Sequence, residues 1–166
     1  MTHPNDPQGA NGFDFFHGRW QVAHRRLAQR LAGSSEWEEF GGTCQVQPLL
    51  GGLGNVDDNT IELPQGHYRA VTLRTYDAAA GNWTIWWLDG RNPAALDAPM
   101  TGRFKGGIGT FHGTDTWEGK PIRIRFQWTM PRPDAPRWEQ AFSADDGASW
   151  ETNWVMDFTR QPAPGL

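Results

Sequence analysis

The residues with the clearest chemical potential are a histidine and an arginine two positions apart, His24 and Arg26. Side chains two residues apart on a β-strand point to the same face, at about 6.6 Å along the strand. If that face is the interior of a barrel, both groups are costly there unless they are paired, hydrated or bound to a ligand. In the alternative interpretation the strand twists or ends early and both side chains lie in water at the rim.

A second pair with the same spacing, Trp37 and Glu39, lies on the next expected strand. Glu39 opposite Arg26 would form an internal ion pair, either purely structural or half of a polar site. General acid–base chemistry would need only one such group with a shifted pKa. The catalytic candidates are therefore His24, Glu39 and Asp89, although Asp89 precedes a glycine and is more typical of a turn.

Tryptophan and polar side chains complete the expected ligand-binding set. The chain has 10 Trp, so some of them are expected to line a binding surface. The ligand-binding candidates, all expected on inward strand faces, are His24, Arg26, Trp37, Glu39, Arg74, Trp87, Trp128, Gln140 and Trp154. Rings favour a flat aromatic body and arginine favours an anionic head, which predicts an aromatic or polyketide-like acid with its head toward Arg26.

Metal and cofactor sites are not expected from this sequence. The five histidines show no metal-ligand spacing, and Cys44, the single cysteine, reads as a buried inert thiol. Asn55 and Asp57 adjoin a glycine-rich corner, where a turn role is expected. No nucleophile elbow, phosphate loop or zinc-protease motif is present. We therefore expect no metal and no cofactor.

Strand patterns separated by turn residues run along the chain, without long helical periodicity. The clearest expected strands, given by residue number, are 18–31, 36–49, 53–61, 67–76, 83–89, 100–104, 108–112, 122–130, 137–144 and 150–160. The expected inward faces of the strands at 122–130 and 150–160 are Ile122, Ile124, Phe126, Trp128 and Met130, and Trp150, Thr152, Trp154, Met156 and Phe158. Gly41 and Gly42 predict a kink or bulge. Successive hairpins without exposed edges predict an all-β fold, a closed antiparallel up-and-down barrel of about ten strands.

Length, charge and composition indicate one domain. The chain has 166 residues and a formal net charge of -4, without a basic block, which argues against nucleic acid as a partner. No apolar run approaches the roughly 20 residues of a membrane span, and the polar start lacks a signal-peptide core. A single cysteine fits the cytoplasm. We expect a disordered tail over residues 1–11, one barrel domain over 12–160 and a C-terminal tail over 161–166, with a homodimer left open.

The motif Gly18-Arg19-Trp20 resembles the Gly-x-Trp signature of lipocalins and other calycins. The resemblance implies that Trp20 plugs one barrel end and that a basic residue near the last strand, here Arg160, covers its ring through a cation–π contact. Longer stretches, residues 48–57, 86–91, 137–143 and 150–154, resemble a bacterial lipocalin-like family, domain of unknown function 1579. That similarity spans residues 13–160 and implies a calycin barrel but no reaction. In the related nitrobindins one histidine holds heme, and His24 or His112 could imitate it, although no local motif matches.

Three kinds of function are compared. The first is a binder that encloses a small, partly apolar, aromatic molecule. The second is an enzyme, such as an isomerase, cyclase, hydratase or decarboxylase, that uses His24, Arg26 and Glu39. The third is a carbohydrate-binding module with an exposed platform of Trp83, Trp86, Trp87 and Trp117. Scattered tryptophan positions argue against the third. The fold cannot decide between the first two, and the surplus of rings favours the binder.

Overall fold

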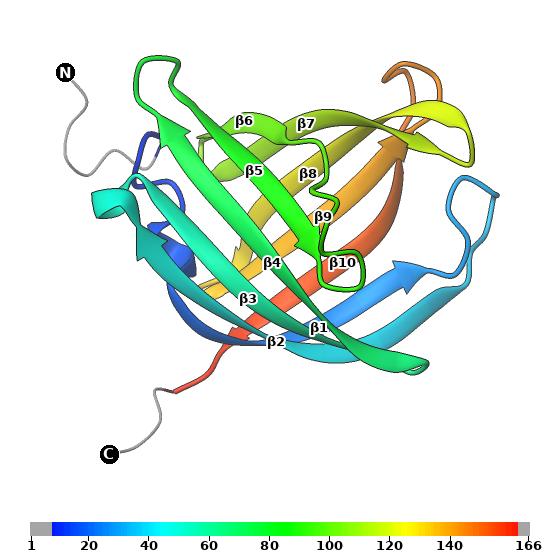
Figure 1. The fold of residues 1–166 in the computed structure, drawn as a ribbon, viewed down its shortest axis with the longest axis horizontal. Coiled ribbons are helices and arrows are strands. Elements are labelled where there is room, and N and C mark those ends of the chain that lie inside the picture. The colour runs from blue at the N-terminus through cyan, green and yellow to red at the C-terminus, as the bar shows by residue number, and fades with distance from the viewer. Residues whose placement is uncertain (1–7, 163–166) are drawn as a thin grey trace.

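The computed structural model describes residues 8–162, which form ten antiparallel strands closed into a barrel (Figure 1). The strands are β1 (Gly18–Leu27), β2 (Trp37–Leu49), β3 (Gly54–Leu63), β4 (Gly66–Asp77), β5 (Asn82–Asp89), β6 (Met100–Lys105), β7 (Ile108–Trp117), β8 (Lys120–Arg132), β9 (Ala135–Ser143) and β10 (Glu151–Arg160). Each strand pairs with its neighbour in sequence and β10 pairs with β1. The predicted up-and-down barrel is confirmed. No helix in residues 8–162 is long and apolar enough to cross a membrane.

Alternation of side chains along each strand gives the barrel an inner and an outer face. In β8 the predicted inward residues Ile122, Ile124, Phe126 and Trp128 line the interior, whereas Met130 is exposed near the strand end. In β3 the same alternation turns polar residues inward, so that Asn55, Asp57 and Asn59 are buried. The interior is therefore aromatic on one wall and polar on another.

A β-bulge in β10 alters the predicted inward face of this strand. The pairing with β9 shifts between Thr152 and Trp154, so Asn153 is an extra residue. The side chains of Trp154, Met156 and Phe158 face inward as predicted. The ring of Trp150 instead lies 4.7 Å from the Arg125 guanidinium on the outer face of β8. The prediction for Trp150 and Thr152 is wrong because one inserted residue inverts which face each earlier side chain occupies.

The two glycines of β2 lie in continuous pairing with both neighbouring strands, so the predicted bulge is wrong. Gly42 serves a different purpose. A Cβ atom there would lie 3.0 Å from His24 Nε2 and 2.5 Å from the carbonyl oxygen of Thr60. The missing side chain therefore gives His24 room against the barrel wall.

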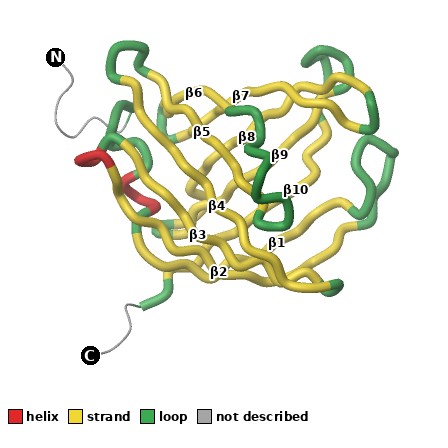
Figure 2. Tube along the Cα trace, viewed as in Figure 1, coloured by secondary structure: helices red, strands yellow, loops and turns green. Residues whose placement is uncertain are grey.

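The segment before β1 closes one end of the barrel. Both short 3-10 turns, η1 (Asp14–Phe16) and η2 (Leu50–Gly52), lie at this end, where β10 also finishes (Figures 1 and 2). Gly9 is buried and its carbonyl accepts a hydrogen bond from Trp83 Nε1 at 3.3 Å. Part of the expected tail, residues 8–11, thus belongs to this plug. Residues 1–7 and 163–166 of the expected tails lie outside the described residues.

Trp20 and Arg160 form the predicted contact at the closed end. The Arg160 guanidinium lies 4.1 Å from the centre of the fully buried Trp20 ring, and Trp20 Nε1 donates to the Phe16 carbonyl at 2.8 Å. Arg160 also donates to the carbonyl of His17 at 2.7 Å. Gly18 has a φ of +116°, and a Cβ atom there would lie 2.7 Å from Arg160 Nη1. The glycine of the Gly-x-Trp motif therefore leaves space for the arginine.

Candidate functional site

The barrel encloses a cavity of about 310 Å³ that extends from the open end to the plug. Its deep lining includes Phe16 and Phe158, and its mouth is lined by Arg30, Asp115 and Trp117. The wall between them is mostly aromatic and includes Trp87, Trp128, Trp138, Trp154, Phe126 and Phe142. Ligand pockets have volumes of roughly 300–1,000 Å³, so this cavity can hold a small molecule.

The barrel wall is incomplete where β5 and β6 separate. Pairing between these strands runs only from Trp83↔Gly102 to Ile85↔Met100. The loop of residues 90–99 crosses the remaining gap and is held by a 3.1 Å hydrogen bond from Asp97 N to the Trp87 carbonyl. Asp97 lines the cavity from this loop. This side of the mouth is therefore formed by a loop instead of a strand.

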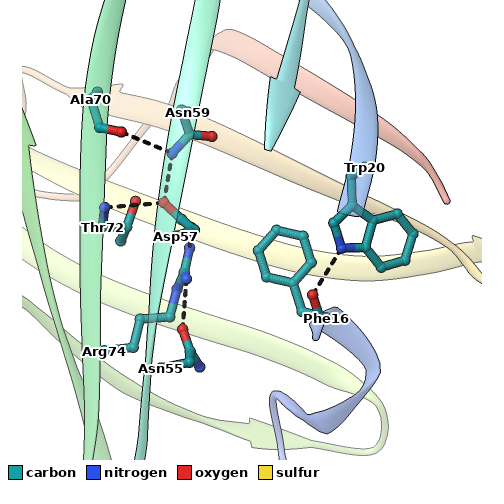
Figure 3. Close-up of polar contacts among 8 residues, drawn as sticks. All are labelled: Phe16, Trp20, Asn55, Asp57, Asn59, Ala70, Thr72 and Arg74. Carbon is teal, nitrogen blue, oxygen red and sulfur yellow. Dashed lines mark hydrogen bonds and ion pairs between the residues drawn. The ribbon is translucent and has the colours of Figure 1, made fainter. Parts of the chain in front are cut away.

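A buried polar network on β3 and β4 forms the floor of the cavity (Figure 3). Arg74 and Asp57 make an ion pair with an N–O distance of 2.7 Å, and their side chains are 5% and 2% exposed. Asp57 also accepts hydrogen bonds from Asn59 Nδ2 at 2.5 Å and from the backbone N–H of Thr72 at 3.0 Å. Arg74 Nη1 donates to Asn55 Oδ1 at 2.9 Å. The guanidinium charge is thus neutralised inside the protein.

This floor corrects the turn role expected for Asn55 and Asp57. Both lie inside β3 and face the interior. The sequence did carry a signal, because Asn55, Asp57 and Asn59 alternate at the inward parity of a strand. Arg74 was singled out from sequence, but its carboxylate partner was missed.

His24 and Arg26 face inward as predicted, yet neither is among the cavity-lining residues. Trp154 Nε1 donates to His24 Nδ1 at 3.1 Å, and the His24 ring stacks on Phe40 at 4.7 Å. Burial, with a smaller contribution from the charge of Arg26, lowers the pKa of His24 to about 4. His24 is therefore a neutral acceptor that fixes the orientation of the Trp154 indole.

The guanidinium of Arg26 lies between two rings near the mouth. Its distances to the ring centres of Phe40 and Trp154 are 5.4 Å and 5.3 Å. Within residues 8–162, Arg26 has no carboxylate at ion-pair distance. The group is held by these aromatic contacts.

Trp37 and Glu39 lie on the outer face of β2, so their predicted inward placement is wrong. Both are exposed, and Glu39 pairs with Arg25 instead of Arg26. The residues of β2 that face the interior are the alternate ones, which include Phe40. The acid–base trio expected from His24, Arg26 and Glu39 does not assemble.

Asp89 lines the mouth, where Arg91 engages its carboxylate. Arg91 Nη2 lies 2.7 Å from Asp89 Oδ2, and the backbone N–H of Arg91 donates to Asp89 Oδ1 at 2.8 Å. The Arg91 hydrogen bond lowers the pKa of Asp89. Asp89 is thus an ionised residue of a turn, the role that its following glycine indicates.

The remaining predicted tryptophans and Gln140 are placed in the cavity wall. Trp87, Trp128 and Trp154 line the cavity together with Gln140, whose Nε2 donates to Asn153 Oδ1 at 2.8 Å. Sequence analysis missed Trp138 as a lining ring, although it lies two residues from Gln140 and so shares its face.

Cys44 and the histidines within residues 8–162 form no metal-binding cluster. Cys44 lines the cavity as a buried thiol, and burial, followed by the charge of Asp57, raises its pKa well above the usual range. His112 is exposed on the outer face of β7. Across residues 8–162, no three His, Cys, Asp or Glu side chains come together in a way that could hold a metal ion.

The fold and the cavity define a lipocalin-like antiparallel barrel. No protein-family model matches the chain, and none of the curated proteins matches it. Among solved structures, the S-type phycobiliprotein lyase from Guillardia theta is similar with a TM-score of 0.60 and 10% identity, over 92% of each chain. At this identity the likeness shows the fold alone. The resemblance to domain of unknown function 1579 has no family match behind it.

Proposed function

We propose that this chain binds a small, partly apolar, aromatic molecule inside its barrel. The observation that carries the proposal is the cavity of about 310 Å³ between the mouth and the plug. Trp87, Trp128, Trp138 and Trp154 border this space, and such rings bind flat molecules through stacking and burial of apolar area. A ligand site of this kind would account for the high number of tryptophans in the sequence.

An anionic head group, as in an aromatic acid, is favoured on the β1–β2 side of the mouth, where Arg30 lines the cavity and Arg26 lies nearby between Phe40 and Trp154. Arg26 has no ion-pair partner in the described chain, whereas Arg74 at the floor is already paired with Asp57. Asp97 and Asp115 line the mouth from the β5–β7 side, across the barrel from β1. An acid head would therefore turn toward β1, with its rings deeper in the cavity.

The comparison with the Guillardia theta protein supports this proposal at the level of the fold. A protein described as a phycobiliprotein lyase uses a barrel of the same kind. We also propose, on the four sequence stretches alone, that the chain belongs to domain of unknown function 1579. Neither point names the ligand of this chain.

The test is a binding measurement with a matched pair of variants. 2-Naphthoic acid should raise the melting temperature and quench tryptophan fluorescence. Trp87 lines the cavity, whereas its neighbour Trp86 faces outward and pairs with Leu73. Trp87→Ala should weaken binding about fivefold to tenfold, since one stacking ring is worth about 1–1.4 kcal/mol, and Trp86→Ala should leave it unchanged. Absence of any thermal shift across a panel of aromatic acids and neutral aromatic molecules would refute the proposal.

A further inference from the structure

Five buried side-chain nitrogens in residues 8–162 have no hydrogen-bond partner, and all of them are donors. They are Arg30 Nε, Asn55 Nδ2, Arg74 Nε, Trp117 Nε1 and Asn153 Nδ2. A buried donor without an acceptor costs about 1–3 kcal/mol, so several in one small domain call for an explanation.

Three of these donors border a single space, and the other two are one hydrogen bond away from its lining. Arg30, Arg74 and Trp117 line the cavity. Asn55 is bonded to Arg74, and Asn153 is bonded to the cavity-lining Gln140. In the described part of the chain, three of the five unpaired donors therefore belong to cavity-lining residues, and no unpaired buried side-chain acceptor matches them.

The floor and the mouth differ in charge. At the floor, the 2.7 Å ion pair cancels the charges of Arg74 and Asp57, and the rings of Phe13, Phe16 and Trp128 lie within 5.7 Å of the guanidinium. A carboxylate from a ligand would meet Asp57 there without a free counter-charge, whereas a neutral oxygen would meet only donors.

At the mouth, Arg30 stacks over the Trp117 ring at 5.1 Å. Arg30 has no carboxylate at ion-pair distance within the described residues. An acceptor at this end can therefore be neutral or anionic, because the guanidinium charge is available to it.

We infer that the ligand is an aromatic molecule rich in hydrogen-bond acceptors, with an uncharged carbonyl oxygen at the floor beside Arg74 and a second acceptor at the mouth beside Arg30 and Trp117. The inference rests on the proposed function and narrows it to oxygenated aromatic compounds such as aromatic ketones and keto acids. It also fixes the orientation: the carbonyl enters first and any acid group stays at the mouth.

The floor is tested with three molecules of nearly the same shape. Fluorene has neither donor nor acceptor at its central ring, 9-fluorenone has a carbonyl acceptor, and carbazole has an N–H donor. We expect 9-fluorenone to bind at least tenfold more tightly than fluorene and carbazole to bind most weakly. The carbonyl stretch of bound 9-fluorenone should move to lower wavenumber, which reports the hydrogen bond directly.

Variants then locate the effect. The double variant Asp57→Asn/Arg74→Met removes both charges together, and it should reduce the preference for 9-fluorenone over fluorene to less than threefold while fluorene still binds. Arg74→Lys keeps the charge but lacks Nε, so it gives the same readout if the double variant does not fold. The control, Arg30→Met at the mouth, should leave that preference intact but weaken 9-fluorenone-4-carboxylic acid.

Each outcome separates the two proposals. Equal affinity for the three molecules, or a preference for carbazole, overturns the acceptor inference and leaves aromatic binding standing. Loss of the 9-fluorenone preference in Arg30→Met overturns the orientation. If no aromatic probe binds, acid or neutral, the proposed function falls and the inference falls with it.

Discussion

The two halves of the barrel are built from the same kinds of ring and differ in what lies on the barrel axis. At the closed end, the plug inserts Phe13 against Trp83 and Phe104, edge to face, with ring centres 4.9 Å and 4.8 Å apart. In the open half, Trp87 and Trp154 meet only at 6.2 Å and border the cavity. Aromatic residues alone therefore do not make a binding site. A cavity is left only in the half of the barrel that the plug segment does not fill.

The largest expected effect is the loss of a plug ring. Trp20→Ala should lower the free energy of unfolding by about 4 kcal/mol, because a fully buried indole and its hydrogen bond to Phe16 are removed. Trp87→Ala should cost roughly 1–2 kcal/mol, since that ring lines the cavity and is packed on fewer sides. Urea denaturation of both variants measures the contrast. Equal losses would mean that the two halves are packed alike.

Removing Arg74 alone should destabilise the protein by about 3 kcal/mol. Arg74→Met leaves the Asp57 carboxylate buried without its partner, and an uncompensated buried charge is strongly unfavourable. The double variant Asp57→Asn/Arg74→Met should regain most of that loss. A double variant that is no more stable than Arg74→Met would show that the ion pair is not the source of the effect.

Acid should weaken the open half through His24. Its folded-state pKa of about 4 lies below the ordinary 6.5, so the unfolded chain binds the proton more readily and stability falls as pH drops from 6.5 to 4. The expected loss is roughly 2–3 kcal/mol, with little further contribution from His24 below pH 4. His24→Gln can still accept a hydrogen bond from Trp154 but does not titrate. Its stability profile should be flatter over this window, and identical profiles would contradict the assignment.

The smallest effect concerns the outer clamp on the plug. Arg160→Ala should cost about 1–2 kcal/mol, because the guanidinium covers Trp20 and bonds to the His17 carbonyl. Arg137 is the control, since it pairs with Asp157 at 2.7 Å on the half-exposed surface without covering a plug ring. Arg137→Ala should cost less than about 1 kcal/mol. A larger loss for Arg137→Ala would show that the ring contact is not what matters.

The sequence was sufficient for the barrel and the inward face of β8, because regular alternation and hairpin turns determine them. The closing Trp20–Arg160 contact was expected only from the resemblance to calycins. The sequence was insufficient where either set of alternate residues in a strand could have faced the interior. Around β2 both parities offer an aromatic and an acidic residue, Trp37 with Glu39 or Phe40 with Glu38, and only packing against the neighbouring strands selects between them. The bulge at Asn153 could not be predicted, because no glycine or proline marks it in the sequence.

The candidate site was predicted in part for a related reason. Side chains that line a cavity follow from the inward parity of their strands, which explains the success with Trp87, Trp128 and Gln140. The Arg74–Asp57 pair joins β4 to β3 and depends on register, which the sequence does not state. His24 faces the interior but packs behind Trp154. Alternation along a strand does not show whether an inward side chain reaches the cavity or is covered by another one.

Pairing of the first strand with the last makes the cavity a late product of folding. Trp20 lies opposite Arg160, so the seam joins positions that are far apart in sequence, and such closure is slow because the loop entropy is lost before the contacts form. Trp154 and Phe158 of β10 belong to the cavity wall. A nascent chain therefore has no enclosed space to offer a ligand until its tenth strand has docked, and a ligand present during refolding should accelerate none of the earlier steps.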